Sequence, residues 1–144
     1  MKSLIDYINE SIQISESKKE IDSLIKAIKS GNSDNIVTVC EMIVSDNKDN
    51  LIDSADTDDL EDGMFVGILD TNKDESKHIG RIVIVHRNMD TDKKQYYSLY
   101  AERSGKIEFD ESDKLQGDIF GKSWKIVYFE HVDEDVIDAM FDVK

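Results

Sequence analysis

The sequence of 144 residues contains one cysteine, Cys40, and no proline. A single cysteine cannot form an intramolecular disulfide, which fits a reducing compartment, and it offers no cysteine cluster for a metal. No apolar run approaches the roughly 18 residues that a membrane span needs. The first residues include acids where a secretory signal would be apolar, so we expect neither a signal peptide nor a membrane partner.

Motifs for nucleotides and metals are also missing. There is no Walker loop and no GxGxxG pattern. No histidine has another at metal-ligand spacing among His78, His86 and His131. Two acidic turns, starting at Asp70 and Asn88, resemble the opening of a calcium loop, but position 12 is Arg81 in the first and Leu99 in the second. We therefore predict no metal site, no cofactor and no catalytic residues.

Acidic residues outnumber basic ones by 32 to 18, and the net charge is −14. The charge is uneven: residues 41–75 hold twelve acids and two lysines, a net of −10, whereas residues 1–30 hold five of each. A charge this negative opposes contact with nucleic-acid backbones, so direct nucleic-acid binding is not expected. It is compatible with a basic protein partner, with bound cations, or simply with solubility.

The N-terminal third shows helical periodicity over residues 3–15, 18–29 and 33–44. Gly31 is predicted to end the second helix, and Ser33 is predicted to cap the third. The β-branched residues of the third segment would also suit a strand. The apolar faces of the three helices are formed by Leu4, Ile5, Ile8 and Ile12; by Ile21, Leu24, Ile25 and Ile28; and by Ile36, Val37, Val39, Cys40, Ile43 and Val44.

Strand patterns dominate the rest of the chain. After an acidic segment at 45–63, we predict strands at 64–69, 79–87, 95–102, 106–109 and 124–130, with Ile82–Val85 in a central strand. A helix at about 133–142 follows, capped by Asp133. The fold class is therefore α+β: N-terminal helices, a small antiparallel β meander or barrel of about five strands, and a C-terminal helix. The predicted organisation is a helical segment (1–44), an acidic linker (45–63) and a β module with the last helix (64–144), together one compact domain.

An aromatic and basic group occurs in the strand region. Aromatic residues near basic residues can stack single-stranded bases, but a β-sheet packing surface is the favoured interpretation because the chain is so acidic. The group contains Tyr96, Tyr97, Tyr100, Arg81, Arg87, Lys93 and Lys94.

The N-terminus carries a short repeat, Ile8-Asn9-Glu10-Ser11 and Ile14-Ser15-Glu16-Ser17. The first ten residues resemble the capsid-targeting peptides of internal head proteins in T-even-type tailed phages. Those peptides begin Met-Lys and continue to an acid, an aromatic residue, isoleucine, any residue and glutamate. Similar openings would suit phages of the crAss-like type. The matching positions are Lys2, Asp6, Tyr7, Ile8 and Glu10.

The resemblance implies two roles for residues 1–16. The prohead protease of that family cuts after an Ile/Leu-x-Glu tripeptide that precedes a small residue, so Glu10 and Glu16 are the implied processing positions. A short amphipathic helix is marginal alone in water and is stabilised when its apolar face lies in a partner's groove. The predicted partner-binding residues are Leu4, Ile5, Tyr7, Ile8 and Ile12.

These observations lead to a hypothesis of a non-enzymatic structural protein of a tailed-phage virion, associated with the head or neck. Its partners would be capsid, portal or other virion proteins, or further copies of itself. It would be found in the virion and, during assembly, in the host cytoplasm. One alternative is an acidic DNA mimic that inhibits a host nucleic-acid-binding protein. Another is a small enzyme with a site built from scattered residues such as Cys40, His86 and Tyr100.

Overall fold

The computed structural model of the chain describes residues 18–52, 62–69, 77–88, 90–113, 120, 123–131 and 133–143. Residues 18–29 form a helix. The elements that follow are α2 (Ser33–Asp46), the 3-10 helix η1 (Lys48–Asn50), β1 (Gly63–Leu69), β2 (Ile79–Asn88), β3 (Lys93–Glu102), β4 (Ile107–Ser112), β5 (Trp124–Phe129) and α3 (Glu134–Asp142).

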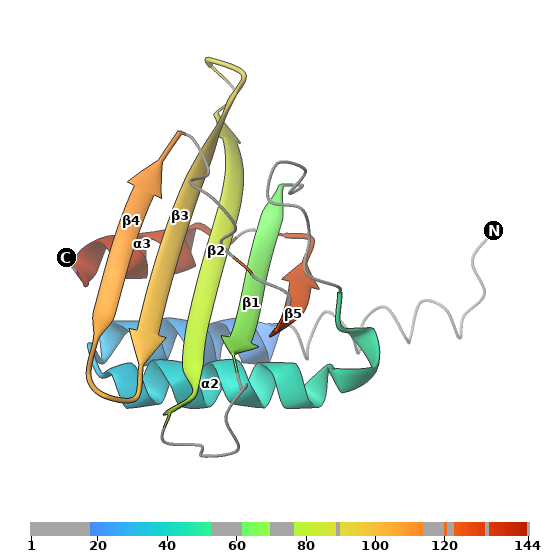
Figure 1. Ribbon diagram of the computed structural model, residues 1–144. Coiled ribbons are helices and arrows are strands. Elements are labelled where there is room, and N and C mark those ends of the chain that lie inside the picture. Colours follow the sequence, from blue (N-terminus) through green and yellow to red (C-terminus); the bar gives the residue numbers. More distant parts are fainter. Residues whose placement is uncertain are drawn as a thin grey trace.

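The strands form one five-stranded antiparallel sheet in the order β4-β3-β2-β1-β5. Strands β1 to β4 make a meander, and β5 returns to lie beside β1 (Figure 1). The sheet is open, with β4 at one end and β5 at the other. The expected α+β class, with N-terminal helices, a five-stranded antiparallel sheet and a C-terminal helix, is confirmed, and the sheet is an open one and not the barrel that was the alternative. The predicted helix at 3–15 lies outside the described residues.

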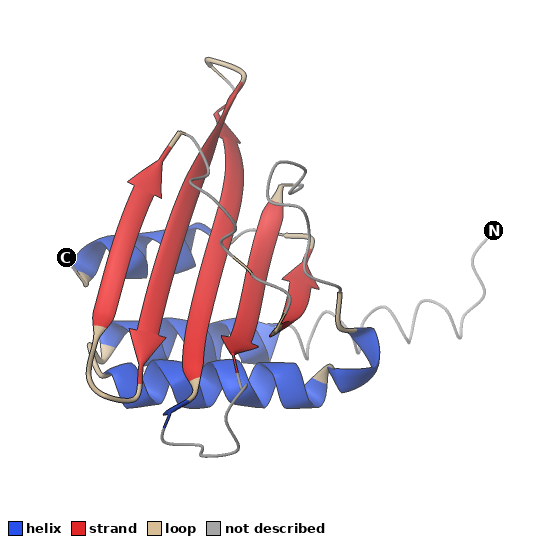
Figure 2. Ribbon diagram, in the orientation of Figure 1, coloured by secondary structure: helices blue, strands red, loops and turns tan. Residues whose placement is uncertain are grey.

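Helix 18–29, α2 and α3 all lie on one face of the sheet (Figure 2). The main core fills the space between these helices and the sheet, and it contains Leu24, Ile28, Val37 and Met140. The predicted central strand is confirmed, because all four residues of Ile82–Val85 are completely buried. Side chains alternate along a strand, so Ile82 and Ile84 join the helical core while Val83 and Val85 face the other side.

A second, smaller cluster covers part of the opposite face. Phe120, from the connection between β4 and β5, is 2% exposed and belongs to this cluster with Phe65 and Ile126. It lies directly over Gly67, where an added Cβ would be only 2.8 Å from the Phe120 ring. Gly67 therefore leaves room for the Phe120 ring against β1.

The helix ends show one correction. Gly31 has φ of 65° and ends helix 18–29, as predicted. The N-cap of α2, however, is Asn32 and not Ser33: Asn32 Oδ1 accepts the backbone N–H of Asp34 at 2.9 Å. Ser33 is already helical and buried, because the chain leaves the glycine turn one residue earlier than expected. The predicted cap of α3, Asp133, is confirmed.

The acidic segment predicted as a linker begins inside the fold. Ser45 and Asp46 belong to α2, and the backbone N–H of Ile52 donates to the carbonyl of Ile126 in β5 at 2.9 Å. Leu51 and Ile52 are half-buried. Residues 53–61 lie outside the described part of the chain.

Candidate functional site

The residues predicted from the N-terminal pattern all lie outside the described part of the chain. The described chain begins immediately after them, at the first turn of helix 18–29. The surface around this turn is therefore the part of the structure nearest in sequence to the predicted docking peptide. The residues concerned are Leu4, Ile5, Tyr7, Ile8 and Ile12, and the implied processing positions Glu10 and Glu16.

A groove of about 490 Å³ lies between the first half of helix 18–29 and the last half of α2. Met42 is 39% exposed and is one of two large apolar side chains exposed among the described residues. The inner face of helix 18–29 is used by the core, since Leu24 and Ile28 are completely buried. The groove is lined by Lys19, Glu20, Ser23, Met42, Asp46 and Asn47.

One end of this groove is held by Asn47. Its side-chain amide donates to the carbonyl of Ile43 at 2.7 Å and to Glu20 Oε1 at 3.2 Å, which ties the end of α2 to the start of helix 18–29. Lys19 and Asp46 add one charge of each sign. The lining of the groove is therefore mostly polar, with Met42 as its large apolar side chain.

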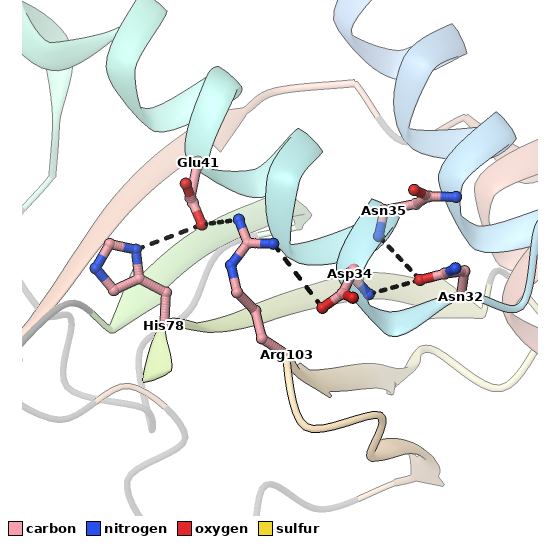
Figure 3. A network of polar contacts seen from close by, with 6 residues as sticks. All are labelled: Asn32, Asp34, Asn35, Glu41, His78 and Arg103. Atoms are coloured by element: carbon pink, nitrogen blue, oxygen red, sulfur yellow. Dashed lines mark hydrogen bonds and ion pairs between the residues drawn. The ribbon is translucent and has the colours of Figure 1, made fainter. Parts of the chain in front are cut away.

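A polar network fixes α2 against the end of the sheet (Figure 3). Glu41 of α2 accepts a hydrogen bond from Arg103, which follows β3, and its Oε1 lies 3.4 Å from Nδ1 of His78, which precedes β2. Arg103 also lies 3.9 Å from Asp34. The side chains of Glu41 and Arg103 are only 25% and 20% exposed, so the pair is partly shielded from water. It joins residues 62 positions apart, and no sequence pattern indicated it.

Below this network, α2 approaches β2 at Gly80. A Cβ at Gly80 would be 3.1 Å from Cys40 Sγ, so the glycine allows this close contact. Cys40 is completely buried, as expected for a small core residue. Burial, with a smaller effect from the neighbouring Glu41, raises the pKa of the Cys40 thiol to about 12, so the thiol is neutral at physiological pH.

The predicted aromatic and basic group divides between the two faces of the sheet. Tyr97 points towards the helices and packs against Phe141, whereas Tyr96 and Tyr100 face the other side. The Arg81 guanidinium lies 5.0 Å from the ring centre of Tyr100 and 5.7 Å from that of Trp124. Partial burial lowers the pKa of Arg81. This arrangement is a packed cation–π cluster and accords with the favoured interpretation of a packing surface.

The structure does not bring together the three residues of the enzyme hypothesis. Cys40 is on the buried face of α2 against β2, Tyr100 lies on the opposite face of the sheet, and His86 is exposed near the end of β2. Burial and a hydrogen bond from the Tyr100 hydroxyl to Glu102 raise the pKa of Tyr100 to about 12. Among the described residues, no group of three His, Cys, Asp or Glu side chains is placed to hold a metal ion.

The acids of residues 41–75 are only partly visible. Eight of the twelve lie outside the described ranges: Asp53, Asp56, Asp58, Asp59, Glu61, Asp70, Asp74 and Glu75. Of the other four, Glu41 is engaged with Arg103.

Within the described ranges, no helix is both long and apolar enough to span a membrane.

In comparisons with known proteins, no family model, no curated protein and no solved structure matches this chain.

Proposed function

We propose that this protein is a non-enzymatic structural component of a tailed-phage virion, head- or neck-associated, that docks on capsid, portal or neighbouring proteins through its N-terminal helices. The observation that carries the proposal is the order of the chain. A peptide with the capsid-targeting pattern leads directly into a helix whose inner face is fixed in the core and whose first turn borders an exposed groove.

The groove supports docking in a specific way. Residues 1–17 attach to helix 18–29 beside Lys19 and Glu20, so a partner that binds the peptide is brought close to Met42. A fixed attachment point lowers the entropy cost of a second contact, because that contact forms within the same complex. We expect the peptide to supply recognition and the groove to orient the bound domain.

Deletion of residues 1–16 tests the proposal. The truncated protein retains every residue of the described core and should unfold at the same urea concentration as the full chain. It should be lost from purified particles when it replaces the full chain during infection. Normal incorporation of the truncated protein would contradict the proposal.

A matched pair of substitutions separates the apolar face from the peptide as a whole. Ile8→Asp places a charge on the predicted docking face and should reduce incorporation at least tenfold. Gln13→Asp adds the same charge outside the predicted partner-binding set and should leave incorporation near normal. Equal loss in both variants would show that net charge, and not the apolar face, is responsible.

The implied processing has its own readout. Protein taken from mature particles should begin at Ser11 or Ser17 when its N-terminus is sequenced, and Glu10→Gln together with Glu16→Gln should leave Met1 in place. An intact N-terminus in wild-type particles would show that the protein is not processed. Docking would then still be tested by the deletion of residues 1–16.

A further inference from the structure

The two edges of the sheet differ. At the β5 edge, the backbone N–H of Ile52 donates to the carbonyl of Ile126 at 2.9 Å. Ile52 therefore covers the middle of the outer side of β5. At the other edge, β4 ends the sheet, and no strand in the described part of the chain pairs with its outer side (Figure 1). An open strand edge presents backbone donors and acceptors to other chains.

The direction of these backbone groups follows from the ladder. The backbone N–H of Glu102 donates to the carbonyl of Lys106 at 2.9 Å, and Ile107 lies opposite Ala101. Hydrogen-bonded and non-hydrogen-bonded pairs alternate in antiparallel sheets. The backbone groups of Ile107 and Glu111 therefore point away from β3, towards the open side.

The helix side of this edge is apolar at Ile107 and Phe109, and the exposed Glu111 follows them on the same side. Phe141 of α3 remains 36% exposed, and its ring centre is 5.2 Å from that of Phe109 in β4 and 5.7 Å from that of Tyr97. Ile107 is half-buried beside them. A strand added next to β4 would place alternate side chains over this group and cover Phe141.

The other side of the edge is acidic. Glu108 and Asp110 are exposed, and both lie on the face opposite the helices. Lys106 lies 3.3 Å from Glu108, but a pair this exposed contributes little. Asp110 makes no ion pair with any residue in the described ranges.

We propose that the outer edge of β4 binds an extended segment of a partner protein in which apolar residues alternate with lysine or arginine. The apolar residues would cover Phe141 and Ile107, and the basic residues would lie opposite Glu108 and Asp110. A second copy of this chain does not fit, because pairing β4 with β4 brings carboxylates against carboxylates. The inference concerns a different surface from the N-terminal docking and does not depend on it.

A short peptide pair tests the proposal. The probe is a capped, fluorescein-labelled hexapeptide alternating lysine and valine, and its control has glutamate in place of lysine. Fluorescence anisotropy with the full chain should show at least tenfold tighter binding of the lysine peptide. The double variant Glu108→Lys, Asp110→Lys should reverse this preference.

Two control variants distinguish strand addition from general attraction to an acidic protein. Asp22→Lys with Asp49→Lys makes the same change of net charge away from β4 and should leave the affinity within about twofold, an electrostatic effect of the size expected for distant exposed charges. Glu111→Pro removes an outward N–H, which edge strands tolerate, and should abolish binding of both peptides while the unfolding midpoint is retained. Glu111→Gln removes the same charge but keeps the N–H, and it should still bind the lysine peptide.

Three results of the peptide experiments would overturn the proposal. These are no difference between the peptides, equal loss of affinity in the distant charge variant, or full binding to the Glu111→Pro variant. Dimerisation of the full chain without peptide, abolished by Glu111→Pro in sedimentation, would assign the edge to a second copy and would refute the basic segment as its occupant.

Discussion

Glu41 links three parts of the chain through one carboxylate. Glu41 lies in α2 and accepts a hydrogen bond from Arg103 in the β3–β4 turn. It also lies close to His78, which precedes β2. The side chains of the three residues are between 14% and 25% exposed, so water competes weakly for these contacts. Removing the charge would leave the Arg103 guanidinium partly buried, with the more distant Asp34 as its remaining counter-charge among the described residues.

We predict that Glu41→Gln lowers the free energy of unfolding by about 1–3 kcal/mol, the range for hydrogen bonds to charged groups that are shielded from solvent. The matched control is Glu108→Gln, whose partner Lys106 is 51% exposed, and it should cost less than about 1 kcal/mol. Urea unfolding at pH 7 measures both values. Equal effects of the two substitutions would contradict the partly buried character of the Glu41 network.

Cys40 gives a second prediction at this scale. Because burial raises the pKa of its thiol from about 9 to about 12, the folded protein holds the proton over a range in which the unfolded chain loses it. The unfolded state is therefore favoured progressively as the pH rises above about 9, and stability should fall there. Cys40→Ala should remove this part of the pH dependence, as measured by urea unfolding between pH 7 and 10.

The same burial governs reactivity. A thiol reagent should modify native Cys40 only at the rate of protein opening and should modify it rapidly in denaturant. Rapid labelling of the native protein at pH 8 would contradict the buried position.

At the scale of helices and strands, local patterns carried most of the fold. The continuous apolar run Ile82–Val85 correctly predicted a central strand, because a strand buried on both faces has apolar residues at every position. The spacing of Leu24 and Ile28 correctly predicted a helix, because a helix buried on one face has apolar residues every three to four positions. The end of β4 was missed by three residues. Its polar end, Glu111 and Ser112, is held in the strand by pairing with Tyr97 and Tyr96, which only the folded sheet provides.

The order of the strands and the side-chain contacts between distant segments could not be predicted from the sequence for a similar reason. Nothing in the pattern of β5 places it beside β1, and a pair such as Glu41 and Arg103 depends on tertiary contact. The groove beside Met42 was also not indicated, since a groove between two helices depends on how they are placed relative to one another.

The cap of α2 gives a prediction at this scale. Asn32 accepts the N–H groups of Asp34 and Asn35, so Asn32→Ala should lower stability by about 0.5–2 kcal/mol. Asn32→Gly should lower stability by only a few tenths of a kcal/mol, because glycine is itself tolerated at N-caps. Thermal and urea unfolding of the two variants provide the comparison, and an equal loss in both would show that the side-chain cap does not contribute.

At the scale of the whole molecule, the net charge of −14 should make stability depend on salt. Self-repulsion among like charges destabilises a compact state, and ions screen it. We predict that raising NaCl from about 20 mM to about 500 mM raises the unfolding midpoint at pH 7, because the Debye length falls well below the size of the domain. Near the isoelectric point of about 4.5 the effect should largely disappear. A midpoint at pH 7 that is insensitive to salt would contradict this reasoning.

The unequal edges of the sheet also set a limit on assembly. Among the described strands, the β5 edge is interrupted at its centre by Ile52, whereas the β4 edge has room for another strand. A molecule with one usable edge can bind at the end of an intermolecular β-sheet, but it offers no second edge to which the next molecule could add. The fold is therefore suited to closed complexes of fixed composition and is protected against growth into fibres.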